Sequence, residues 1–406
     1  MNRTARVVLV LAAAAPLVMS RVVPVVRYGD ASDYVMMAMS IARDGDLRYD
    51  DGDLQRILAD RPPATDYPAG MFLVRDRVGG LHIGGHSFYY PLIATPFYMA
   101  FGFRGFALLN ALLLGVSCFL VSRHFQRTGY WGSVVWAAAG ILCSASATYT
   151  IWPTSEVWLL FLSLAFLSAY QSHRIAVAGS LLGLAAASQA PMGLWVVLPV
   201  ADWIRGRLGL RDLVRLGVLA LTLAAPQVIH YALVSGRAHI AWLDLRTSSR
   251  FLYYPVAFPG QAHFDRAAHA VAFSGFSRLE HFHPGDIVRA LVSPRLGLLW
   301  FYPLSALAVL RMWRERQGGL AAGAALVVLA AFCTAGQLTS HQVGLRYLNP
   351  VYPALLVGFR SFRWDRVERA LLVIGVLLGL SFLFFPRANS SELITHKAVP
   401  TTVLYR

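Results

Sequence analysis

The sequence places Asp30, Asp33 and Tyr34 a few residues after an apolar stretch near residues 7 to 26. A stretch of about 20 apolar residues is long enough to cross a bilayer, so these side chains are expected close to one membrane surface. A carboxylate there is placed to act as a general base on a substrate that arrives through lipid. Asp30 also precedes an amphipathic helical pattern over 35–42, where aspartate more commonly caps a helix. This loop alone leaves both roles open.

The composition of the chain indicates what surrounds these residues. Of its 406 residues, 57% are hydrophobic and only 14% are charged, which excludes a water-soluble globule and indicates a polytopic α-helical membrane protein. The net charge of +15 comes from short arginine clusters between apolar stretches, a distribution typical of membrane topology signals rather than of nucleic-acid binding. All three cysteines, Cys118, Cys143 and Cys333, fall within apolar stretches, so neither a disulfide framework nor a metal-type cysteine spacing is expected.

The apolar stretches predict about eleven transmembrane helices. The first is interpreted as a retained anchor with a cytoplasmic N-terminus, because Val18 to Arg21 is a poor cleavage site. With this orientation every predicted inner loop carries arginine, as the positive-inside rule requires. The predicted spans lie near residues 7–26, 103–122, 130–147, 156–171, 175–189, 191–204, 214–234, 296–311, 319–338, 348–361 and 370–386.

Two predicted outer loops, 27–102 and 235–295, are longer than connectors need to be. Each contains an apolar stretch suited to an interfacial helix, at 90–101 and at 267–276. The odd number of spans leaves the tail 387–406 outside the cell. We therefore expect one membrane domain over 1–406, with the two loops at its outer end.

Five short motifs occur in a consistent order and on one predicted membrane side. They resemble motifs of bacterial GT-C fold glycosyltransferases, which transfer a sugar from a polyprenyl-phosphate donor at the outer membrane face. The resemblance spans most of the chain and implies the GT-C bundle, a cytoplasmic-membrane location and a cell-envelope glycan, lipid or protein acceptor. The motifs are Asp30 to Tyr34 followed by Gly80 to Tyr98, then Trp152 to Glu156, Gly179 to Pro191, Ser293 to Leu299, and Gly344 to Pro350.

The resemblance implies an inverting transferase in which a carboxylate accepts the acceptor's proton while cations neutralise the leaving lipid phosphate. It makes Asp30 the candidate base and Asp33 its substitute. Glu156 is expected either to position the acceptor or a metal ion, or only to cap a helix. Arg346 and Arg295 are the candidate phosphate ligands, because guanidinium offers planar paired donors that match phosphate oxygens. The alternative for both arginines is a lipid headgroup anchor or a topology charge.

Further candidates complete the predicted site. His86 and His341 are expected to add phosphate donors, although a single loop histidine is more often incidental. Tyr34, Tyr89 and Tyr347 are the expected substrate-binding residues. The sequence predicts no metal ligands, because the spacing of His281 and His283 matches no established ligand pair. A divalent cation, magnesium or manganese, is left open as a cofactor.

Other readings of the sequence stay open. Leu345 replaces a proline of the late motif and Gln189 stands where a basic residue is frequent, so a non-catalytic scaffold derived from the same fold is one alternative. A transporter or flippase of lipid-linked saccharides is another. It predicts internal repeats and charges buried within the spans, neither of which the sequence shows.

Overall fold

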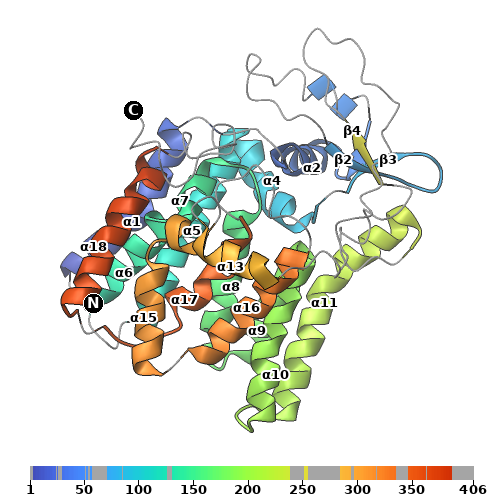
Figure 1. The fold of residues 1–406 in the computed structure, drawn as a ribbon. Coiled ribbons are helices and arrows are strands. Elements are labelled where there is room, and N and C mark those ends of the chain that lie inside the picture. The colour runs from blue at the N-terminus through green and yellow to red at the C-terminus, as the bar shows by residue number, and fades with distance from the viewer. Residues whose placement is uncertain are drawn as a thin grey trace.

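The computed structural model describes fourteen segments of the chain. These are residues 3–23, 25, 30–50, 52–53, 55–56, 71–84, 86–125, 130–237, 251–254, 284–293, 297–316, 318–334, 346–362 and 364–385. Helices make up most of this part, as the composition predicts (Figure 1). The predicted interfacial stretch 267–276 and the tail 387–406 lie outside the described residues.

The helices follow the predicted spans closely, and several spans consist of two shorter helices. In chain order they are α1 (Arg3–Val22), α2 (Ala31–Arg43), α4 (Tyr89–Phe101), α5 (Arg104–His124), α6 (Tyr130–Leu142), α7 (Ala145–Thr148), η2 (Tyr149–Ile151), α8 (Glu156–Gln171), α9 (Ile175–Ser188), η3 (Ala190–Val196), α10 (Val197–Ile204), α11 (Leu210–Ser235), α13 (Pro284–Val292), α14 (Leu298–Phe301), α15 (Ser305–Glu315), α16 (Gly319–Thr334), η6 (Arg346–Leu348), α17 (Tyr352–Leu356) and α18 (Arg366–Phe384).

Within the described residues, three helices are long and apolar enough to cross a membrane: α5, α11 and α18. The segments 132–142 and 145–151 would together form a fourth span, bent by 60° at the break between them. The helices α8, α9 and α16 are apolar but shorter. The expected count of about eleven spans therefore stays a prediction.

A small antiparallel sheet joins the two predicted outer loops, and its strand order is β1-β3-β2-β4. The strands are β1 (Arg48–Tyr49), β2 (Met71–Arg75), β3 (Leu81–Ile83) and β4 (Phe251–Tyr254). β4 comes from the second loop and pairs with β2 of the first, Leu252 opposite Leu73. This sheet corrects the all-α expectation. Strands of two to five residues carry little periodic signal, and pairing across about 180 residues of sequence is not encoded locally.

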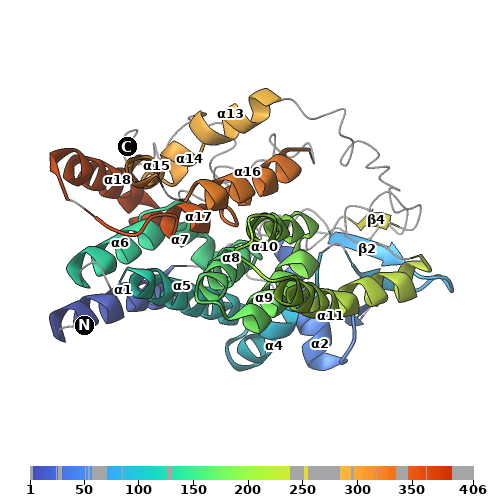
Figure 2. The same ribbon diagram turned by 90° about the horizontal axis from the view of Figure 1, so that it is seen from below.

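The core of the bundle lies around α8, whose residues are almost all buried. The pair α9 and α11 packs closely, because a Cβ on Gly183 would lie 2.3 Å from the carbonyl oxygen of Ala220. Small residues allow such close approach between membrane helices. In contrast, α11 and α18 expose apolar side chains such as Leu221 and Leu377, as expected of helices that face lipid. Figure 1 places α2, α4 and the sheet at one end of the bundle, away from the turn between α10 and α11, and Figure 2 shows α9 beside α11.

Candidate active site

Asp30 occupies the N-cap position of α2, yet its side chain makes no capping hydrogen bond to the helix. Its carboxylate instead accepts a hydrogen bond from the Nη1 atom of Arg346 and forms an ion pair with it. Arg346 begins η6, 316 residues further along the chain. The structure thus shows Asp30 in a tertiary ion pair and not in the cap role, and the pair connects the first predicted outer loop to the late motif.

His86 lies between the two aspartates of the first loop. Its Nε2 atom is 3.6 Å from Oδ1 of Asp30 and 3.4 Å from Oδ2 of Asp33. The imidazole also stacks on the ring of Tyr34, with 4.9 Å between ring centroids. His86 follows β3 and precedes α4, so the sheet and α4 together fix its position. A protonated His86 would therefore be a second cation between two carboxylates.

Glu156, the first residue of α8, adds a third carboxylate. Its Oε1 atom is 3.4 Å from Nη1 of Arg346, the same nitrogen that binds Asp30. The other terminal nitrogen of Arg346 donates to the hydroxyl of Tyr347, 3.0 Å away. One guanidinium therefore connects two acids and a phenol. We call the five residues Asp30, Asp33, His86, Glu156 and Arg346 the acid–arginine cluster.

Three hydrogen bonds that the sequence did not suggest hold the cluster in place. The hydroxyls of Tyr34 and Ser155 are 2.8 Å apart, which ties α2 to the start of α8. The amide nitrogen of Asn110 on α5 donates to the backbone carbonyls of Tyr149 and Trp152, each 3.0 Å away, and so anchors the segment that leads into α8. The only sequence signal for Ser155 was its position next to Glu156. Asn110 gave none beyond being a buried amide within an apolar span.

The cluster has a more accessible side and a buried side. The side chains of Asp30 and Arg346 are 15% and 10% exposed, whereas those of Asp33, His86 and Glu156 are only 1%, 3% and 4% exposed. Among these described side chains, Asp30 and Arg346 are therefore the least buried.

Burial and charge act in opposite directions on Asp30. Burial by itself would raise the pKa of this carboxyl, but the positive charges of Arg346 and His86 hold the pKa well below its usual range. Burial raises the pKa of the Tyr34 phenol, and the nearby carboxylates of Glu156 and Asp30 raise it further. Asp30 is therefore ionised, and Tyr34 keeps its phenolic proton.

Of the other predicted site residues, the structure describes the tyrosines but not Arg295 or His341. Tyr347 contacts the cluster through Arg346 and stacks on Phe332, while Tyr89 donates from its hydroxyl to the carbonyl of Leu223 on α11, 2.5 Å away. The substrate-binding roles of Tyr34, Tyr89 and Tyr347 stay predictions. Arg295 and His341 lie outside the described residues. Within the described part of the chain, no group of three or more histidine, cysteine, aspartate or glutamate residues is arranged to hold a metal ion.

Comparison with known proteins supports the fold. No protein-family model matches the chain, and no curated protein matches its sequence. The structure is similar to the crystal structure of ArnT from Cupriavidus metallidurans bound to undecaprenyl phosphate, with a TM-score of 0.51 and 14% identity. That match covers 95% of this chain and 64% of the ArnT chain. A second structure of the same protein, in the apo state, matches with a TM-score of 0.48 and 18% identity, over 93% of this chain and 64% of that one.

ArnT is a GT-C glycosyltransferase, so the predicted resemblance to the GT-C fold is confirmed for this chain. The shared architecture covers nearly the whole of this chain but less than two thirds of ArnT. At this level of identity the similarity establishes the fold alone.

Proposed function

We propose that this protein is a glycosyltransferase that moves a sugar from a polyprenyl-phosphate donor to a cell-envelope acceptor at the outer face of the cytoplasmic membrane. The observation that carries the proposal is the ion pair between Asp30 and Arg346 on the more accessible side of the cluster. The candidate base and the candidate phosphate-binding arginine are therefore adjacent within a GT-C fold. The ArnT structure was solved with undecaprenyl phosphate, which supports a lipid phosphate as the shared ligand chemistry.

In the proposed reaction an acceptor hydroxyl attacks the anomeric carbon of the donor sugar. Asp30 takes the hydroxyl proton as the new carbon–oxygen bond forms. The bond between the anomeric carbon and the phosphate oxygen breaks, and its electron pair leaves with the polyprenyl phosphate. Arg346 stabilises the charge that develops on this leaving group. Attack from the face opposite the phosphate inverts the anomeric configuration.

The resting ion pair has a consequence for this mechanism. A carboxylate held by a guanidinium has a low proton affinity, so Asp30 is a poor base in the free protein. A donor phosphate that binds Arg346 would compete with Asp30 for the same nitrogen atoms. Its negative charge would offset that of the guanidinium and raise the pKa of Asp30. We therefore propose that donor binding itself activates the base.

The remaining cluster residues support this exchange. Glu156 is close enough to Arg346 to keep the guanidinium in place once Asp30 has released it. His86 faces both aspartates and is placed to donate to the phosphate or to orient Asp30. Asp33 is almost fully buried behind His86, so we assign it a positioning role and not the role of the base. Arg295 and His341 stay predicted phosphate ligands.

The decisive experiment incubates purified protein with a panel of radiolabelled polyprenyl-phosphate sugars and a membrane extract as the acceptor source. We expect one donor to be consumed, with release of polyprenyl phosphate, and Asp30→Asn to abolish the release. Parallel reactions with and without a chelator test whether magnesium or manganese is needed. Consumption of no donor would favour the scaffold alternative. Movement of an intact donor across vesicles would favour the transporter.

A further inference from the structure

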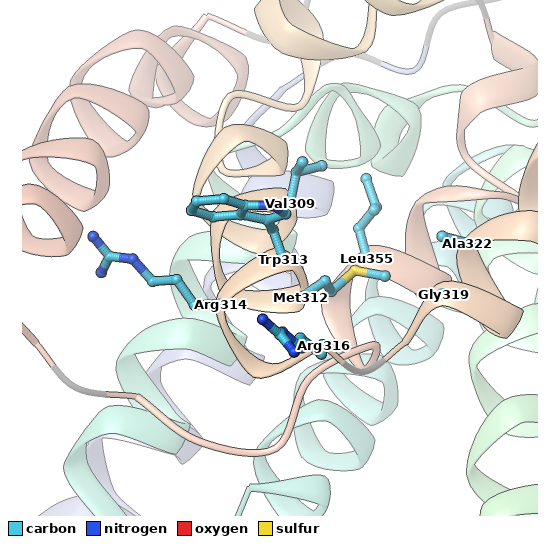
Figure 3. Close-up of a pocket in the computed structure, with 8 residues that line it drawn as sticks. All are labelled: Val309, Met312, Trp313, Arg314, Arg316, Gly319, Ala322 and Leu355. Atoms are coloured by element: carbon cyan, nitrogen blue, oxygen red, sulfur yellow. The ribbon is translucent and has the colours of Figure 1, made fainter.

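A pocket lies far from the acid–arginine cluster, between α15, α16 and α17. It has a volume of about 660 Å³ and is shown in Figure 3. Figure 1 places this end of α15 opposite the end that carries α2 and the sheet. Its lining residues are Val309, Met312, Trp313, Arg314, Arg316, Gly319, Ala322 and Leu355.

The rim of the pocket presents positive charge. Arg314 is engaged by Asp365 and Glu368, whereas no carboxylate among the described residues pairs with Arg316. The nearest acid in sequence, Glu315, accepts hydrogen bonds from Arg311 and from the backbone nitrogens of 360 and 361, so it is already occupied. Arg316 therefore offers an exposed guanidinium at the mouth of the pocket.

The wall of the pocket is apolar and partly open. Val309 and Trp313 are one helical turn apart on α15, and both are exposed, the indole by 75%. Met312 and Leu355 are buried behind them. An exposed indole beside an exposed arginine, at the end of the amphipathic helix α15, is typical of the interface between hydrocarbon and headgroups.

We propose that this pocket binds an anionic phospholipid of the membrane leaflet opposite the active site. The phosphate would pair with Arg316, and one acyl chain would lie along Val309 and Trp313. Basic pockets between membrane helices on the cytoplasmic side are a common way of binding anionic lipids. The positive-inside pattern of the sequence places this end of the molecule on that side. This inference goes beyond the proposed function and does not depend on it.

Two substitutions test separately how the charge of Arg316 and the volume of the pocket contribute to lipid binding. Arg316→Asn removes the guanidinium at a left-handed backbone position with φ of 50°, which asparagine adopts readily, so the fold should be kept. Gly319→Phe fills the pocket but leaves the charge, because a Cβ on Gly319 meets no atom within 4 Å. The matched control is Arg205→Asn, an exposed arginine in the turn after α10.

The test is native mass spectrometry of the detergent-purified chain, with equal amounts of phosphatidylglycerol and phosphatidylcholine. We expect the wild-type chain to retain phosphatidylglycerol preferentially. Arg316→Asn should lower that preference about fivefold, the scale of losing one cation near an anionic lipid surface. Gly319→Phe should lower the amount of both lipids retained, and Arg205→Asn should change neither quantity.

Three outcomes would overturn the proposal: no lipid preference in the wild-type chain, an unchanged preference in Arg316→Asn, or unchanged retention in Gly319→Phe. A further arm adds undecaprenyl phosphate to the Arg346→Gln variant, whose proposed donor contact is removed. Displacement of phosphatidylglycerol by low amounts of that lipid would assign the pocket to polyprenyl phosphate instead. Loss of sugar transfer in Asp30→Asn bears only on the proposed function, so the two proposals can fail separately.

Discussion

Arg346 and Asp30, separated by 316 residues of sequence, form one ion pair, and the same Arg346 nitrogen lies 3.4 Å from Glu156. A single guanidinium thus connects the start of α2, the start of α8 and the late motif at η6. Because each contributing segment is short, the geometry of the site depends on the packing of the whole bundle. The proposed mechanism relies on this arrangement, since a phosphate that enters must exchange with Asp30 at Arg346.

Asp30→Asn should abolish sugar transfer while leaving expression largely intact, and donor binding should be retained or tightened, because the carboxylate that competes for Arg346 is gone. The amide keeps the shape of the side chain, and no capping hydrogen bond to α2 is lost, because Asp30 makes none. Loss of a positioned general base lowers kcat by about two or more orders of magnitude. Asp212→Asn, in the first turn of α11, is the control and should retain full activity. Near-normal turnover of Asp30→Asn would move the search for the base to Asp33 and Glu156.

Arg346→Lys should weaken donor binding even though it keeps the positive charge. Lysine lacks the planar pair of donors that matches phosphate oxygens. Hydrogen bonds to charged groups contribute about 1.5–3 kcal/mol, so we expect the donor KM to rise about ten- to a hundredfold, and further in Arg346→Gln. Arg104→Gln, an exposed arginine at the start of α5, is the control. A donor KM that stays unchanged in both Arg346 variants would contradict the assignment.

The pH dependence of the reaction should show the exchange at Arg346. In the free protein the pKa of Asp30 is well below its usual range, so the carboxylate persists into acid. A bound phosphate offsets the charge of Arg346, and the pKa of Asp30 rises. The acid limb of kcat/KM reports the free enzyme and that of kcat reports the complex. We therefore expect the acid limb of kcat to lie at higher pH than the acid limb of kcat/KM. Coincident limbs, measured over about pH 3 to 8, would exclude donor-induced activation.

Arg311 should be among the most important residues for stability at the opposite end of the bundle. It is fully buried and donates to Glu368, Glu315 and the carbonyl of Ser361 at 2.9, 2.6 and 2.8 Å. Arg311→Met would leave the fully buried Glu368 without its main partner, a change that costs about 3–5 kcal/mol. Thermal unfolding in detergent should show a large decrease in the unfolding temperature for Arg311→Met. The added substitution Glu368→Gln should restore part of that stability.

Arg314 provides the comparison for Arg311. It also reaches Glu368, at 3.2 Å, but is 25% exposed, so Arg314→Met should cost clearly less. Equal losses of stability in Arg311→Met and Arg314→Met would show that the buried ion pair of Arg311 with Glu368 is not the main contribution to stability there. Sugar transfer by the surviving Arg311→Met protein should stay close to normal, because the acid–arginine cluster lies at the other end of the bundle (Figure 1).

The predicted orientation of the chain can be tested with reporters. We expect a C-terminal alkaline phosphatase fusion to be active, because the alternating arginine loops place the N-terminus in the cytoplasm and the odd number of spans places the C-terminus outside. A fusion within the turn between α10 and α11, which carries Arg205 and Arg207, should be inactive. The reverse pattern would move the acid–arginine cluster to the cytoplasmic side and overturn the proposed site of reaction.

The sequence by itself determined the class of the protein and most of its helices. Long apolar stretches and arginine clusters are local signals, and they predicted α5, α11 and α18 as well as the helix that starts directly after Asp30. The motifs also indicated Asp30, Glu156 and Arg346 as members of one site, by resemblance to a family. Local patterns succeed here because helix formation in an apolar environment is governed by residues within a few turns of one another.

Only the tertiary structure decided how these residues act together. It buried Asp33 and Glu156 almost completely and left Asp30 and Arg346 slightly more exposed, whereas the sequence offered Asp33 as a substitute for Asp30 without showing that it is enclosed. It also joined the two predicted outer loops through β2 and β4, whose pairing no local pattern encodes. The physical reason is the same in both cases. Burial and ion pairing depend on contacts between segments more than a hundred residues apart, and those contacts exist only once the bundle has packed.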